Sequence, residues 1–136
     1  QQHEIIKTIM RRNIFIKTTL VLLSIVLLFH ICMISKVIPY DIAWGGRLQN
    51  DNEMYVFETI SIAINLFFGI VLLMKGGFIK VYFKPNLINA ILWVFFALFI
   101  LNTIGNLFSE TNFEKLLSLL TLAFSILIWI ILKAKK

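Results

Sequence analysis

Four apolar segments, each long enough to cross a membrane, restrict what this chain can fold into. They cover residues 14–35, 54–74, 87–108 and 116–132. A helix of about 20 apolar residues crosses the hydrocarbon core of a bilayer. Hydrophobic residues make up 60% of the chain and charged residues 15%, whereas soluble proteins carry about 45–50% and about 25%. The sequence therefore predicts an all-α, polytopic integral membrane protein, a single four-helix transmembrane domain over residues 1–136.

The breaks between these segments contain residues that favour turns. The first two breaks contain glycines and prolines, at Pro39, Gly45, Gly46, Gly76, Gly77 and Pro85. Both residue types end helices and favour turns. In the third break Thr111 is followed three residues later by Glu114. This is the spacing of a capping box, so we expect the last helix to begin there.

The basic residues alternate between the two sides of the predicted bundle. Three lie on the side of the loop 36–53, namely Lys36, Arg47 and Lys115, and the other ten of the 13 lie on the opposite side, at the two ends of the chain and in the second break. Cytoplasmic loops of membrane proteins carry an excess of Lys and Arg. The sequence predicts that both termini are cytoplasmic and that the loop 36–53 is extracytoplasmic. Because the basic residues flank apolar segments, the net charge of +6 does not indicate nucleic-acid binding.

Polar side chains occur within the predicted membrane segments, where they are costly and often functional. The most polar of them are His30, Glu58, Asn65, Asn102 and Asn106. With both termini inside, all except Asn65 fall in the outer half of the membrane. The inner half is apolar apart from Asn65, Ser24 and residues at its boundary. We expect a bundle that is polar near its outer surface and sealed below.

Each of these side chains also has a purely structural interpretation. Serine and threonine in membrane helices commonly donate to their own backbone or to a neighbouring helix. Asn102 and Asn106, at i and i+4 on one helical face, fit hydrogen bonds between helices equally well. His30 fits a satisfied core residue or, since its unperturbed pKa is about 6.5, a proton carrier.

Glu58 and the loop before it suggest a capped site. Three roles remain open for Glu58: an ion pair with Arg47 or Lys36, a ligand or proton site, or solvation near the headgroups. An arginine would pair with it better than a lysine, through a bidentate contact. The Gly45-Gly46 turn would let the loop fold back over the bundle, with Tyr40, Asp41, Trp44 and Arg47 capping the site.

Several classes of function find no support in the sequence. The single cysteine, Cys32, excludes an internal disulfide and a Cys-x-x-Cys redox pair. It leaves His3 and His30 as the only other strong ligands for a soft metal. No nucleophile elbow, zinc-protease motif or phosphate-binding glycine loop is present. We expect no cofactor and no metal, and the sequence does not identify an enzyme.

The leading hypothesis is a small membrane protein with an outward-facing pocket that binds or transports a small amphiphile, a lipid or an ion. Its predicted site residues are His30, Tyr40, Asp41, Trp44, Arg47, Glu58, Asn65, Asn102 and Asn106. One alternative is an accessory subunit, or a homo-oligomer, that docks a membrane partner through the outer loop. Another is a lipid-modifying enzyme that uses His30 and Glu58. Richness in Ile, Lys, Asn and Phe suggests an AT-rich bacterial genome, and for a bacterial membrane protein of this kind we expect the inner membrane as its location.

Overall fold

The computed structural model describes residues 1–42 and 48–134. Its elements are α1 (Gln2–Ile34), the short 3-10 helix η1 (Tyr40–Ile42), α2 (Asp51–Lys75), α3 (Pro85–Leu107) and α4 (Asn112–Lys133). Each of these four α-helices is long and apolar enough to cross a membrane, and the described residues contain no strand. The predicted all-α, four-helix membrane fold is confirmed.

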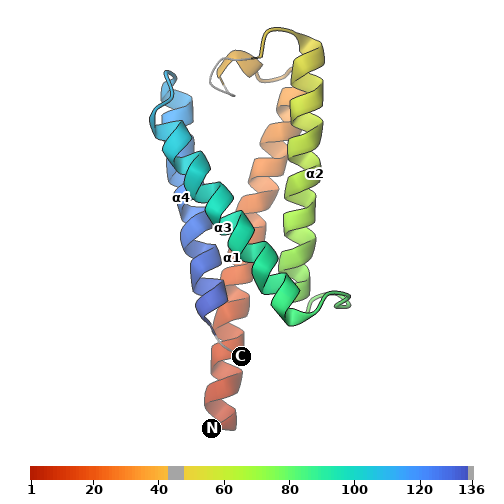
Figure 1. Ribbon diagram of the computed structural model, residues 1–136, viewed down its shortest axis with the longest axis vertical. Coiled ribbons are helices and arrows are strands. Elements are labelled where there is room, and N and C mark those ends of the chain that lie inside the picture. The colour runs from red at the N-terminus through yellow and green to blue at the C-terminus, as the bar shows by residue number, and fades with distance from the viewer. Residues whose placement is uncertain (43–47, 135–136) are drawn as a thin grey trace.

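The first helix is longer than its apolar segment. It begins at Gln2 rather than at residue 14, because residues 2–13 contain no proline or glycine to end it. Its 33 residues correspond to a length of about 50 Å at about 1.5 Å per residue. The N-terminal part of α1 therefore extends past the ends of the other three helices (Figure 1).

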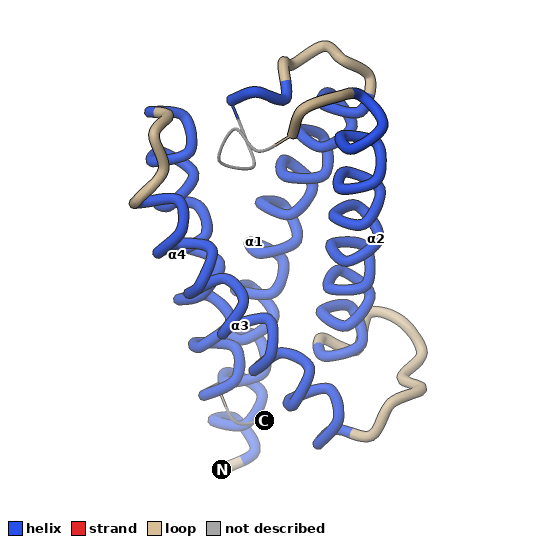
Figure 2. Tube along the Cα trace, turned by 45° about the horizontal axis from the view of Figure 1, so that its top comes forward, coloured by secondary structure: helices blue, strands red, loops and turns tan. Residues whose placement is uncertain are grey.

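The helices follow one another around the bundle, so that α1 packs against α2 and α4, and α3 packs against α2 and α4. The start of α1 and the end of α4 lie at one end (Figure 1), which we call the terminal end; the end that carries residues 35–42, 48–50 and 108–111 is the loop end. Helix α3 starts beside α2 at the terminal end and reaches α4 at the loop end. The pair α1/α2 therefore diverges from the pair α3/α4 toward the loop end (Figure 2).

Aromatic rings from three helices fill the centre of the bundle. Phe68 of α2 lies 4.7 Å from Phe95 and 5.5 Å from Phe99, both on α3, measured between ring centroids. Phe99 stacks on Phe124 of α4 at 4.8 Å. Lipid tails are as apolar as these side chains, so van der Waals packing rather than the hydrophobic effect holds membrane helices together. The stacked rings supply such packing where the two helix pairs meet.

Capping residues explain where α2 and α4 begin. Thr111 is the N-cap of α4, and its side chain accepts a hydrogen bond from the backbone N–H of Glu114, as the sequence predicts. Asn50 caps α2 in the same way, accepting from the N–H of Glu53 at 2.9 Å. Such a cap satisfies a backbone donor that would otherwise have no partner at the helix start.

Helices α1 and α2 each end in a Schellman turn. Val37 N–H donates to the Cys32 carbonyl at 2.9 Å, and Phe78 N–H donates to the Leu73 carbonyl at 2.9 Å. The residue before each donor has a positive φ, 73° at Gly77 and 65° at Lys36. Glycine adopts this left-handed conformation freely, whereas other L-residues pay about 1–2 kcal/mol for it. Lys36 therefore occupies a position whose backbone conformation favours glycine.

A hydroxyl pair joins α3 to α4 in the loop-end half of the bundle. Thr103 Oγ1 lies 2.8 Å from Thr121 Oγ1, and it also donates to the Phe99 carbonyl of its own helix at 2.8 Å. Thr103 is buried. The contact is one of the hydrogen bonds between helices that the sequence leaves open.

We expect Thr103→Val to lower the stability of the bundle by about 0.6 kcal/mol, the mean value for a hydrogen bond between membrane helices. The matched control is Thr18→Val. Thr18 also donates to a carbonyl four residues earlier, at 2.9 Å, but is exposed on α1. Unfolding in mixed micelles measures both variants, and equal losses would show that the contact between the helices contributes nothing.

Candidate functional site at the loop end

A histidine and a glutamate meet between α1 and α2 near the loop end. His30 Nδ1 and Glu58 Oε1 are 2.6 Å apart. Glu58 is fully buried, and the His30 side chain is 15% exposed. A buried carboxylate needs hydrogen-bonding partners, because removing it from water costs several kcal/mol. This short contact is one such partner, and it fixes α1 against α2 below the loop.

A second buried carboxylate stands at the start of α4. The Ser109 hydroxyl donates to Glu114 Oε1 at 2.7 Å, and Thr111 Oγ1 lies 2.9 Å from the same oxygen. Thr111 Oγ1 also lies 3.2 Å from the carbonyl oxygen of Ile42, in η1. The capping residue of α4 therefore connects η1, which follows α1, to the α3/α4 side of the bundle.

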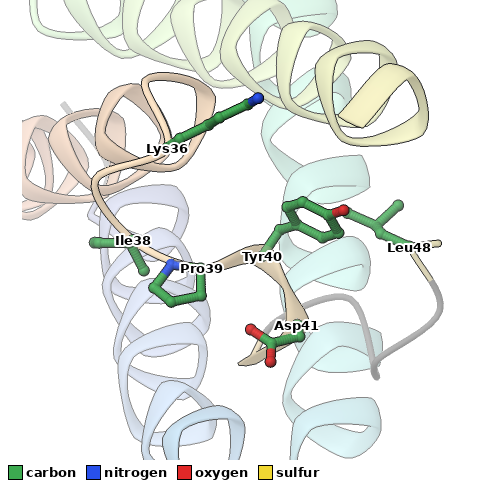
Figure 3. Close-up of a pocket in the computed structure, with 6 residues that line it drawn as sticks. All are labelled: Lys36, Ile38, Pro39, Tyr40, Asp41 and Leu48. Carbon is green, nitrogen blue, oxygen red and sulfur yellow. The ribbon is translucent and has the colours of Figure 1, made fainter. Parts of the chain in front are cut away.

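A cavity with a volume of about 430 Å³ lies in the loop itself. Its lining consists of Lys36, Ile38, Pro39, Tyr40, Asp41 and Leu48. Three of these side chains are aliphatic, one is phenolic and two carry opposite charges. Figure 3 shows the Tyr40 ring beside Leu48 and the Lys36 side chain extending toward α2. We call this cavity the loop pocket.

The ammonium of Lys36 is already engaged on one side. It forms an ion pair with Asp51, in the first turn of α2, and lies 6.0 Å from the centre of the Tyr55 ring. The hydrogen bond and the charge of Asp51 raise the pKa of Lys36 above the usual 10.5. Lys36 is therefore protonated at every pH near neutrality. An ammonium has three donors, so it can bind Asp51 and a ligand oxygen at the same time.

The nine predicted site residues divide among several places. Tyr40 and Asp41 line the loop pocket, while His30 and Glu58 form the buried pair. Trp44 and Arg47 lie outside the described residues, so the predicted lid and the Arg47–Glu58 ion pair stay predictions. The other base considered for Glu58, Lys36, pairs with Asp51 instead.

The three asparagines occupy two different surfaces. Asn102 and Asn106 follow Phe95 and Phe99 on α3 by seven residues each, so they continue the helical face that meets the aromatic core. Asn102 is exposed and Asn106 is half-buried. This exposure is consistent with the divergence of α3 from α2 toward the loop end. Asn65 lies near the middle of α2 and lines a separate groove against α1. The structure does not bring Asn65 into the loop pocket.

Sequence reasoning missed part of the loop pocket and the role of two acids. Ile38, Pro39 and Leu48 come from a loop whose path no periodicity predicts. Asp51 and Glu114 stand in first turns of helices, where acidic residues favour the helix N-terminus. A signal for Glu114 was present in the capping spacing, but that spacing does not predict that the carboxylate is buried.

Within residues 1–42 and 48–134, no three His, Cys, Asp or Glu side chains converge as a metal site would require. No protein-family model, no curated protein and no solved structure matches the chain. The fold and the site thus define a class only: a four-helix membrane protein with two buried carboxylates and a histidine near its loop end.

The His30–Glu58 contact predicts a specific loss of stability. We expect His30→Ala to lower the free energy of unfolding by about 1–3 kcal/mol, because the buried carboxylate loses a hydrogen-bonding partner. The control is His3→Ala, which removes the exposed histidine near the start of α1 and should change stability by less than about 0.5 kcal/mol. Unfolding in mixed micelles gives both values. A loss no larger for His30→Ala than for His3→Ala would contradict the structural role of the pair.

Proposed function

We propose that this protein binds an amphiphile, of the lipid or lipid-like class, by its polar head in the loop pocket. The observation that carries the proposal is the lining of the pocket. Lys36 and Asp41 offer one charge of each sign, and Ile38, Pro39 and Leu48 offer apolar contact. Ligand sites combine mostly apolar walls with a few placed polar groups in this way.

The position of the pocket along the bundle supports an amphiphile rather than a fully soluble ligand. Helix α1 ends at Ile34, two residues before Lys36, so the pocket lies at the depth of the lipid headgroups. A headgroup that carries a phosphate and an ammonium would complement Lys36 on one side and Asp41 with Tyr40 on the other. The proposal includes the orientation predicted from charge, in which the loop end faces outward from a cell membrane.

The buried contacts below the pocket support the same function. The His30–Glu58 pair fixes the ends of α1 and α2, and Thr111 fixes η1 to the start of α4. The segment 36–42, which supplies five of the six pocket residues, therefore follows a fixed helix and is held at Ile42 by a contact with α4. A site whose supporting residues are fixed in this way loses little entropy when it binds a ligand.

The first test is binding of defined lipids by the purified protein, measured by native mass spectrometry. The probes are phosphatidylcholine, phosphatidylglycerol and a fatty acid. We expect the zwitterionic lipid to remain bound, and Lys36→Gln or Asp41→Asn to weaken it about tenfold, the value of one charge-assisted hydrogen bond. The controls Lys115→Gln and Glu110→Gln remove exposed charges at the same end. Equal losses in controls and pocket variants would contradict the proposal.

The left-handed backbone at Lys36 gives a second test, by separating stability from binding. Lys36→Gly and Lys36→Gln both remove the ammonium, but only glycine relieves the positive φ of 65°. We expect Lys36→Gly to be more stable than Lys36→Gln by about 1 kcal/mol, while both bind lipid equally weakly. If Lys36→Gly bound lipid like the unchanged protein, the lysine side chain would have no part in binding.

A second candidate function is acid–base catalysis on a lipid, which the 2.6 Å distance between His30 and Glu58 favours. A carboxylate that orients a histidine is a recurrent element of catalytic sites. The two candidates differ in one observable. Catalysis requires lipid turnover by the pure protein that is lost in Glu58→Gln, whereas the binding function requires bound lipid that is recovered chemically unchanged.

A further inference from the structure

A groove at the surface of the α1/α2 pair contains two polar side chains near the middle of the membrane segments. Its volume is about 210 Å³, and Ser24 of α1 and Asn65 of α2 lie in its otherwise apolar lining. Ser24 is close to the midpoint of the apolar segment 14–35, and Asn65 is close to the midpoint of 54–74. Both therefore lie near the centre of the bilayer, where a polar side chain is costly.

The groove faces away from the bundle core. Leu66 and Ile70, which line it, are 51% and 48% exposed, whereas Phe68 between them is fully buried against α3 and α4. The floor is Gly69, where an added Cβ would lie 3.1 Å from Leu23 Cδ2. A glycine at this point lets α1 and α2 pack close together, because an added Cβ would press against the Leu23 side chain.

The amide of Asn65 is only partly satisfied. Its Nδ2 donates to the Ser61 carbonyl at 2.8 Å. A primary amide has a second N–H and an acceptor oxygen. Among residues 1–42 and 48–134 neither group has a hydrogen-bond partner, and the side chain is half-buried rather than exposed to water. An acyl chain in the groove would leave both groups unpaired, which is unfavourable in an apolar medium.

We propose that a second copy of this chain covers the groove, in a two-fold symmetric dimer in which the two Asn65 side chains hydrogen-bond to each other. The remaining donor and acceptor of one Asn65 complement those of another. Two copies inserted in the same orientation are related by an axis along the membrane normal, which places both Asn65 residues at the same depth. In parallel coiled coils, a single asparagine at a core position specifies the register and the oligomeric state.

The test measures association of the full-length protein in lipid vesicles, by energy transfer between labelled copies across a dilution series. We expect a dimer, and a dissociation constant raised about tenfold by Asn65→Leu. The control Asn102→Leu removes an exposed asparagine from α3 and should leave association unchanged. Because Asn65→Leu replaces a costly polar group with an apolar one, the variant should fold.

Crosslinking locates the contact independently. In a Cys32→Ser background, Leu66→Cys should form an intermolecular disulfide on oxidation in vesicles. Leu122→Cys, 40% exposed at a matching depth on α4, should not. Three results would each overturn the proposal: a protein monomeric at every dilution, crosslinking as efficient at position 122 as at 66, or a lipid or a different polypeptide retained by the pure protein and lost in Asn65→Leu.

Discussion

Water is absent from the hydrocarbon core of a bilayer, so the polar groups of this chain must find hydrogen-bonding partners inside the protein. Regular helices satisfy the backbone, and the polar side chains use what remains. Thr19 and Ser125 donate to carbonyls four residues earlier. Thr103 and Thr121 share a hydrogen bond between helices, and Glu58 meets His30. Within the described residues, no fully buried side-chain nitrogen or oxygen lacks a partner.

This constraint makes the middle of the bundle different from its loop end. Toward the middle, stacked phenylalanines from α2, α3 and α4 pack closely and need no hydrogen bonds. Toward the loop end the helix pairs diverge, and the residues there are carboxylates, hydroxyls and a histidine that hold short hydrogen bonds. Most of these hydrogen bonds lie within one helix pair, as between His30 and Glu58. Across the divergence, Thr111 lies beside the Ile42 carbonyl and the Phe29 ring lies 5.3 Å from the Phe113 ring.

The helices, the start of α4 and the location of the polar residues along the chain could be predicted, because apolar length and capping spacing are local properties of the sequence. Which helix packs against each polar face could not be predicted. Glu58 and Asn65 lie seven residues apart on one stripe of α2, and that stripe faces α1 rather than an interior cavity. The two residues consequently serve different contacts about 10 Å apart along the helix. The loop pocket was beyond prediction for another reason: it depends on the left-handed turn at Lys36 and on the reach of its side chain to Asp51.

The α1/α2 contact carries the candidate functional features at three depths. Lys36 and Asp51 join the two helices at the pocket, His30 and Glu58 join them below it, and Leu23 and Gly69 bring them into close contact beside Asn65. The α3/α4 pair has a different task. It shares the more extensive helix contact, contributes two of the three helices of the aromatic core, and receives η1 through Thr111. A division of this kind follows from the divergence of the bundle. The α3/α4 pair, which shares the more extensive contact, supplies the support. The α1/α2 pair carries the polar groups of both proposals, at the loop end for a ligand and at its outer surface for a second helix.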